Sequence, residues 1–104
     1  MTAATIVYKG NTFRLKITCY DWDGTTLLDP TVLGLKIYDN AGATVITKAI
    51  TDLTHDSLGI YHYDYAVTTV GDYAYEWAGT LGGEAMVQYG YFSVQYLEFP
   101  LGDD

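Results

Sequence analysis

Apolar and polar residues alternate along most of this chain, with the period of two that is typical of a half-buried β-strand. The segment 13–19 has an apolar residue at each odd-numbered position, and the segment 33–37 repeats the pattern. Glycine, aspartate and asparagine interrupt the alternation roughly every ten residues, which is the turn spacing of an all-β sandwich or barrel. No segment has the apolar period of an amphipathic helix. The pattern predicts seven strands, at about residues 4–8, 12–20, 32–38, 44–50, 59–66, 72–79 and 85–96.

A row of aromatic residues between positions 61 and 77 raises the first question about function. Tyrosine or tryptophan stands at every second position on both sides of a short break, at Tyr61, Tyr63, Tyr65, Tyr73, Tyr75 and Trp77. The row is either an exposed binding face, for example for sugar rings, or the inner face of a sheet. We prefer the core interpretation, because six exposed rings would form a large apolar patch that favours aggregation.

Length and charge narrow the class of protein. A chain of 104 residues, 49 % of them apolar, is long enough for one domain with its own core. Its net charge of −8 opposes binding to nucleic acid and to anionic membranes, so we expect neither partner. The first ten residues lack the basic start and apolar run of a secretion signal, so we expect the protein either to stay where it is made or to leave by another route, such as cell lysis inside an assembled particle. Cys19 is the single cysteine, so no internal disulfide is expected, and its parity predicts that it faces the core.

Several short motifs resemble bacterial and phage immunoglobulin-like domains, over nearly the whole chain. They are Gly10-Asn11-Thr12-Phe13-Arg14-Leu15, Tyr20-Asp21-Trp22-Asp23-Gly24-Thr25, Asp29-Pro30-Thr31-Val32, and the run from Gly59-Ile60-Tyr61 to Gly71-Asp72-Tyr73-Ala74-Tyr75-Glu76-Trp77. The resemblance implies a single immunoglobulin-like antiparallel β-sandwich of about seven strands over residues 1–96. It also implies a tyrosine corner, in which the Tyr73 hydroxyl binds nearby backbone. The paired cysteines of antibody domains are absent, and Tyr75 stands where the second would be expected.

Small domains of this type, without an enzyme module, resemble accessory structural proteins of tailed phages. The resemblance implies a non-enzymatic virion protein, made in the host cytoplasm, that serves as a capsid decoration or as a head or tail accessory. Its implied partners are other virion proteins, either the major capsid protein or head and tail proteins, with self-association as a further option. Because one fold serves many functions, this step rests on analogy. A carbohydrate-binding or adhesin module and a subunit of an extracellular filament are the alternatives.

Little in the sequence could carry catalysis or hold a metal or cofactor. His55 lies in a predicted loop between two nearby aspartates, where an acid–base or metal role competes with a solvated polar loop. His62 is expected on the polar side of its strand, without a special role. The segment 21–24 begins like a calcium-binding loop, but Val32 stands where an EF-hand loop needs its closing glutamate. No phosphate-binding loop or nucleophile elbow is present, so we expect no enzyme, no cofactor and no metal site.

Strand parity suggests a surface for partners. Phe92 and Val94 are expected to face the core, which places Tyr89 and Tyr91 on the outer face of the last strand. That strand should pair with 72–79, which should pair with 32–38. The outer face would then show Tyr38, Ala74, Tyr89 and Tyr91, with flat spots at Gly34 and Gly90. Rigid tyrosines of this kind suit protein contact, or stacking on sugar rings.

The residues beyond the last strand are a second candidate for partner contact. Pro100 and the two final aspartates predict an irregular acidic tail at 97–104. Its apolar residues either pack on the domain itself or dock on a neighbouring subunit. The predicted partner-binding residues are Tyr38, Tyr89, Tyr91, Leu97, Phe99 and Leu101.

Overall fold

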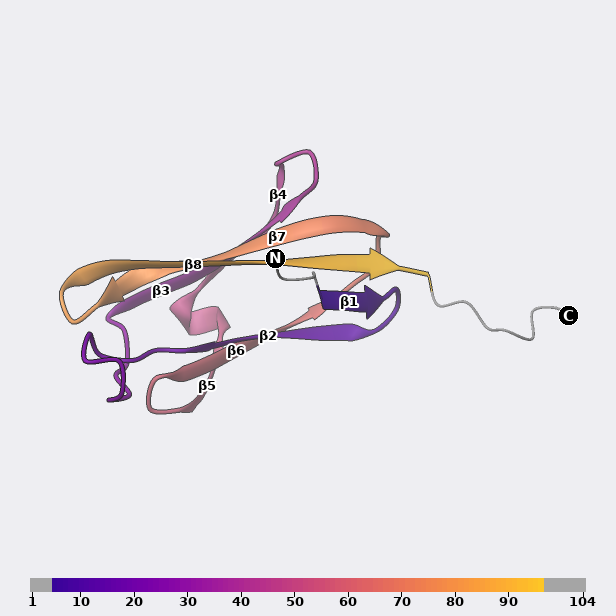
Figure 1. Cartoon of the computed structure of the whole chain (residues 1–104). Helices are drawn as coiled ribbons and strands as arrows, with labels where there is room; N and C mark the ends of the chain where they lie inside the picture. The colour runs from indigo at the N-terminus through magenta and orange to yellow at the C-terminus, as the bar shows by residue number, and fades with distance from the viewer. Residues whose placement is uncertain (1–4, 97–104) are drawn as a thin grey trace, which may run out of the picture.

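The computed structural model describes residues 5–96 and shows an immunoglobulin-like β-sandwich of two sheets (Figure 1). The larger sheet has five strands in the order β1-β8-β7-β3-β4, and the smaller has three in the order β2-β6-β5. The strands are β1 (Thr5–Tyr8), β2 (Thr12–Thr18), β3 (Val32–Asp39), β4 (Thr44–Ala49), β5 (Thr54–Ser57), β6 (Ile60–Ala66), β7 (Gly71–Leu81) and β8 (Glu84–Gln95), with a 3₁₀ turn at Ile50–Asp52. The predicted all-β sandwich is confirmed.

Strand β1 pairs in parallel with β8, from Thr5 opposite Phe92 to Tyr8 opposite Gln95. The other strand pairs are antiparallel, so the expectation of a purely antiparallel sandwich is wrong at this edge. After β1 the chain turns at Gly10, whose φ of +95° suits glycine, and enters β2 in the smaller sheet. At one end of the sandwich, β1 therefore lies in the opening between β8 and β2 (Figure 1).

The core lies between the two sheets and centres on Phe92, which is almost fully buried. The Tyr73 ring stacks on Phe92 with centroids 5.1 Å apart, and the Phe13 ring lies against it at 4.8 Å. Burial of one such ring stabilises the fold by about 1.5–3 kcal/mol relative to exposure. The buried hydrophobic residues are Val7, Leu15, Ile17, Cys19, Leu33, Leu35, Ile37, Tyr61, Val67, Tyr73, Trp77, Leu81, Phe92 and Val94.

The aromatic row of residues 61–77 belongs to this core, as predicted. Tyr61, Tyr73 and Trp77 are buried, while Tyr63, Tyr65 and Tyr75 are partly buried and pack against the core. The Tyr73 hydroxyl donates a hydrogen bond of 2.8 Å to the carbonyl of Thr69, four residues upstream. This contact is the tyrosine corner that the resemblance implied. The inward position of Cys19 is confirmed as well.

The seven predicted strands are present, and their ends differ from the prediction by one or two residues. The structure adds an eighth strand, β5, where the sequence predicted a loop. Its sequence, Thr-His-Asp-Ser, has no apolar alternation and all four residues are exposed, so the pattern gave no signal for it. Backbone pairing with β6 holds β5 at the edge of the smaller sheet.

Strands β7 and β8 form a long hairpin. Its pairing runs from Gly71 opposite Val94 to Leu81 opposite Glu84. The turn is the pair Gly82 and Gly83, both with positive φ, which suits the tight turn of a two-residue hairpin. The predicted pairing of β8 with β7, and of β7 with β3, is confirmed. Within residues 5–96, no helix has the length and apolar character needed to cross a membrane.

Candidate partner-binding face and edge groove

The three tyrosines that were predicted to bind a partner, Tyr38, Tyr89 and Tyr91, lie together on the outer face of the larger sheet. In one row across β3, β7 and β8, Tyr38 lies opposite Ala74, which lies opposite Tyr91. In the next row, Glu76 separates Lys36 from Tyr89. Tyr89 and Tyr91 are 66 % and 67 % exposed, and Tyr38 is half-buried. We call this surface, centred on Tyr38, Tyr89 and Tyr91, the tyrosine face.

Glu76 is the charged group at the centre of the tyrosine face. The Tyr38 hydroxyl donates to the Glu76 carboxylate at 3.2 Å. Hydrogen bonding to the same carboxylate raises the pKa of Tyr89. Partial burial, followed by the charge of Glu76, raises the pKa of Tyr38. Glu76 therefore favours the neutral form of both phenols.

The tyrosine face is more apolar than the sequence analysis recognised. Ile6, Val32 and Val87 are exposed and lie on the same side of the sheet, on β1, β3 and β8. Their parity along the predicted strands could have revealed them. Exposed large apolar residues gathered on one sheet face are typical of an interaction surface.

Gly34 and Gly90 lie on opposite faces of the larger sheet. Gly34 lies on the outer face, opposite Ala78, as expected. Gly90 does not: it lies opposite Tyr75 on the inner face, and a Cβ there would come within 2.2 Å of the end of the Tyr75 side chain. The expectation of a flat outer spot at Gly90 is therefore wrong, and the missing side chain makes room for a core tyrosine instead.

A shallow hollow adjoins the tyrosine face near the β3–β4 turn. It has a volume of about 390 Å³ and is lined by Tyr38, Asp39, Asn40, Gly42, Asp72, Tyr73, Ala74 and Tyr91. Three tyrosines and three polar side chains thus share one depression, which could accept a protruding side chain of a protein partner. The predicted tail residues Leu97, Phe99 and Leu101 lie outside the described residues.

The two histidines lie on strands of the smaller sheet, and each contacts an aspartate. His55 lies on β5, where its ring stacks on Tyr61 at 4.4 Å and its Nε2 is 3.0 Å from Asp29. His62 is only 8 % exposed, and its Nδ1 lies 2.7 Å from Asp56, which also belongs to β5. His62 lies on the polar side of β6, as expected, but the expectation that it has no special role is wrong, because its contact with Asp56 links two strands. Among the described residues, no three histidine, cysteine or acidic side chains are placed to hold a metal ion.

In the turn at residues 21–24, the Asp23 carboxylate is hydrogen-bonded to neighbouring residues of the same segment. The Asp23 carboxylate accepts hydrogen bonds from the backbone N–H groups of Thr25 and Thr26, both at 2.9 Å, and from the Thr26 hydroxyl at 2.6 Å. These bonds lower the pKa of Asp23 to about 2, with the Thr26 hydroxyl as the largest cause. Gly24 follows with a φ of +79°. The arrangement favours a self-contained turn over a calcium loop.

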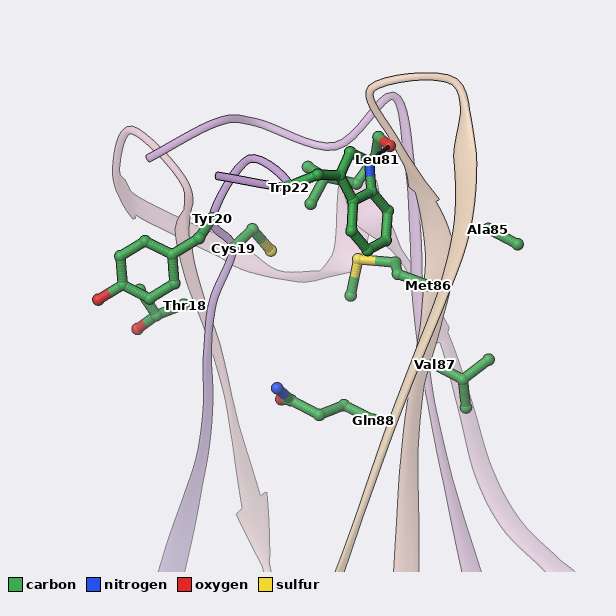
Figure 2. A pocket seen from close by; sticks show the side chains of 9 residues that line it. All are labelled: Thr18, Cys19, Tyr20, Trp22, Leu81, Ala85, Met86, Val87 and Gln88. Atoms are coloured by element: carbon green, nitrogen blue, oxygen red, sulfur yellow. Dashed lines mark hydrogen bonds between the residues drawn. The ribbon is translucent and has the colours of Figure 1, made fainter. Parts of the chain in front are cut away.

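A second hollow lies beyond the start of β1, between the end of β2 and the start of β8 (Figure 2). It has a volume of about 430 Å³ and is lined by Thr18, Cys19, Tyr20, Trp22, Leu81, Ala85, Met86, Val87 and Gln88. We call it the edge groove. The Trp22 indole donates to the carbonyl of Leu81 at 3.1 Å, which fixes the ring across the end of the groove. Sequence reasoning missed this site, because it depends on where β1 begins relative to β8.

The comparisons with known proteins bear on the fold. No protein-family model matches the sequence, and no curated protein matches it. The chain is similar to the solved structure of CopC from Methylosinus trichosporium OB3b, with a TM-score of 0.66 and 17 % identity over 94 % of this chain and 89 % of CopC. It is also similar to the endo-β-1,4-mannanase from Thermotoga petrophila, with a TM-score of 0.64 and 14 % identity over 92 % of this chain. The chain spans 18 % of that mannanase. At these identities the likenesses establish the fold alone.

Proposed function

We propose that this domain is a non-enzymatic structural protein of a phage virion, which decorates the capsid or serves as a head or tail accessory. It is made in the host cytoplasm and binds other virion proteins through the tyrosine face. The observation that carries the proposal is the pair Tyr89 and Tyr91, which are two-thirds exposed on a rigid sheet beside Ile6 and Val87. Tyrosines on a rigid support are the residues that most often anchor protein interfaces.

The titratable side chains support a structural role over a catalytic one. Arg14 and Asp64 form a two-pronged ion pair across β2 and β6, with distances of 2.8 and 3.0 Å. His62 is held by Asp56, and Asp23 is occupied by its own turn. Each of these groups already has a partner that stabilises the fold. The resemblance to phage immunoglobulin-like domains supplies the virion context.

Incorporation into particles tests the proposal. The double variant Tyr89→Ala, Tyr91→Ala should be lost from purified particles when it is supplied in place of the original chain. Its free energy of unfolding should change by no more than about 1 kcal/mol, because exposed substitutions usually cost within 0.5 kcal/mol each. Leu58→Ala is the control, since Leu58 is 55 % exposed but lies in the turn before β6 in the other sheet. Normal incorporation of the double variant would contradict the proposed attachment surface.

A carbohydrate-binding or adhesin module is the second candidate. It is favoured by Trp22, which is 58 % exposed at the edge groove beside Gln88 and Thr18. An exposed indole next to amide and hydroxyl groups can stack on a sugar ring and bind its hydroxyls. A domain-sized part of a mannanase has the same fold, which is compatible with this candidate.

A further inference from the structure

One edge of the larger sheet is only half covered. Strand β1 pairs with residues 92–95 of β8, whereas residues 84–91 of β8 have no strand on that side within residues 5–96. Strand β2, which borders the same opening, is also an edge strand of its sheet. An edge with unpaired backbone groups is a template for the addition of another strand.

The register shows which backbone groups face the free side. Leu81 and Glu84 flank a two-residue turn, so they form a hydrogen-bonded pair, and even-numbered residues of β8 direct their N–H and C=O groups to β7. Odd-numbered residues direct theirs to the other side. The hydrogen bond of the odd-numbered Gln95 confirms this direction, because its carbonyl accepts a bond of 2.8 Å from the N–H of Lys9, which follows β1. The backbone groups of the odd-numbered residues 85–91 therefore face the free edge.

The edge groove lies directly beside this free edge. Met86 and Gln88 point into the groove from β8, while Ala85 and Val87 point away from it (Figure 2). The sulfur of Met86 lies below the Trp22 indole in this view (Figure 2). None of the lining side chains carries a full charge at neutral pH, although the chain as a whole is strongly acidic. A strand added to β8 here would rest alternate side chains on a floor of uncharged side chains, which includes Met86 and the Trp22 indole.

We propose that residues 97–101 of a second copy of this chain dock in the edge groove as an added strand, parallel to β8 and in line with β1. The segment reads Leu-Glu-Phe-Pro-Leu, so Leu97, Phe99 and Leu101 share one side and can face the groove together. In a parallel pair, the residues that face the groove also direct their backbone groups to β8. Glu98 and Pro100 then face outward, and the N–H that proline lacks is not needed by the ladder.

The parallel direction follows from Pro100. In an antiparallel arrangement the outward residues would have to bind the odd-numbered residues of β8, and Pro100 could not donate. The existing strand β1 shows the same parity as the proposed one. Val7 faces the core, and Lys9, two residues later, donates to β8.

Chain length requires that the added strand come from another copy. The segment begins two residues after Gln95, at the far end of β8, while a parallel strand must begin near Ala85. Ten strand residues span about 33 Å, and two residues reach only about 7 Å. The contact is therefore head-to-tail between copies, which produces a ring if it closes and a filament if it does not.

Self-association of the purified full-length chain tests this inference, which goes beyond the virion proposal and can fail independently of it. We expect the molar mass in sedimentation velocity to rise with concentration. The full-length variant Leu97→Ser, Phe99→Ser, Leu101→Ser should stay a monomer. Val87→Pro, which removes one edge N–H, should also stay a monomer, and it should lose more association than Val87→Ala, which keeps that N–H. Circular dichroism confirms that each variant is folded.

Peptide binding provides the second measurement. A synthetic peptide of residues 96–104 should bind the monomeric serine variant and shift its Trp22 emission, and the same peptide with the three serines should not. Equal mass of the original chain and the serine variant at all concentrations, together with no peptide binding, would overturn the inference. Protection of the Ala85 and Val87 amides from hydrogen exchange in the serine variant would overturn it too, because the edge would then be covered within one chain. An emission shift with oligosaccharides but not with the peptide would assign the groove to a glycan instead.

Discussion

The substitution Gly59→Ala probes the contact between the β5–β6 turn and the segment that follows β2. Gly59 precedes β6 with a φ of +76°. Its N–H donates to the Asp29 carboxylate at 2.6 Å, and its carbonyl accepts from the Cys19 N–H at 2.7 Å. A Cβ at this position would lie 2.7 Å from the carbonyl oxygen of Cys19 and 3.1 Å from the nitrogen of Leu28. Those two atoms are themselves hydrogen-bonded to each other, at 3.1 Å.

The expected cost has two parts. A side chain in the left-handed region costs about 1–2 kcal/mol. The crowded Cβ must also displace the bond between Leu28 and Cys19, and a buried backbone group that loses its partner costs about 1–3 kcal/mol. We therefore expect Gly59→Ala to lower the free energy of unfolding by about 2–5 kcal/mol.

Gly24→Ala is the matched control, measured by urea unfolding under the same conditions. Gly24 has nearly the same backbone angle, with φ of +79°, but nothing lies within 4 Å of its added Cβ. Gly24→Ala should therefore lower the free energy of unfolding only by the backbone contribution of about 1–2 kcal/mol. The difference between the two variants isolates the contact with Cys19 and Leu28. Equal losses would refute the reasoning, because they would show that the turn accommodates the methyl group without breaking a bond.

Two further predictions concern Asp23 and Trp22. The hydrogen bonds to Thr25 and Thr26 hold the pKa of Asp23 at about 2, below its ordinary value of 3.8, so they stabilise the folded chain above about pH 4 and this contribution is lost as the pH falls toward 2. The difference in unfolding free energy between the original chain and Asp23→Ala should be constant above about pH 4 and should shrink as the pH falls toward 2. A difference that stays undiminished at pH 2 would contradict the predicted direction of the pH dependence. For Trp22, we expect no emission change on titration with a panel of oligosaccharides, with Trp22→Phe as the control that leaves only the buried Trp77. A saturable shift that Trp22→Phe abolishes would favour the carbohydrate-binding candidate.

Most of the core could be predicted from the sequence, because strand parity is a local property. The aromatic row at 61–77 and the inward pair Phe92 and Val94 are inside, and their neighbours Tyr89 and Tyr91 are outside. Features without an apolar alternation could not be predicted. Strand β5 is polar and exposed at all four positions, and only its pairing with β6 makes it a strand.

Features that depend on long-range register were missed for a different reason. The parallel pairing of β1 with β8 is set by the crossing of the chain between sheets, which local patterns do not encode. The edge groove lies where β8, which starts at residue 84, extends past Thr5, the first residue of β1, which pairs with residue 92. The burial of His62 follows from the arrival of Asp56 on the unpredicted strand β5. The wrong outward placement of Gly90 could have been avoided, by applying the parity of Tyr89 and Tyr91 to it.

The composition of purified virions tests the central claim most directly. Particles from the source culture would be separated on a density gradient, and this chain would be quantified against the major shell protein by mass spectrometry. We predict a fixed ratio in every particle fraction. A ratio near one to one with the shell protein would identify a capsid decoration, and a few copies per particle would identify a head or tail accessory. Absence of the chain from all particle fractions would contradict the virion proposal.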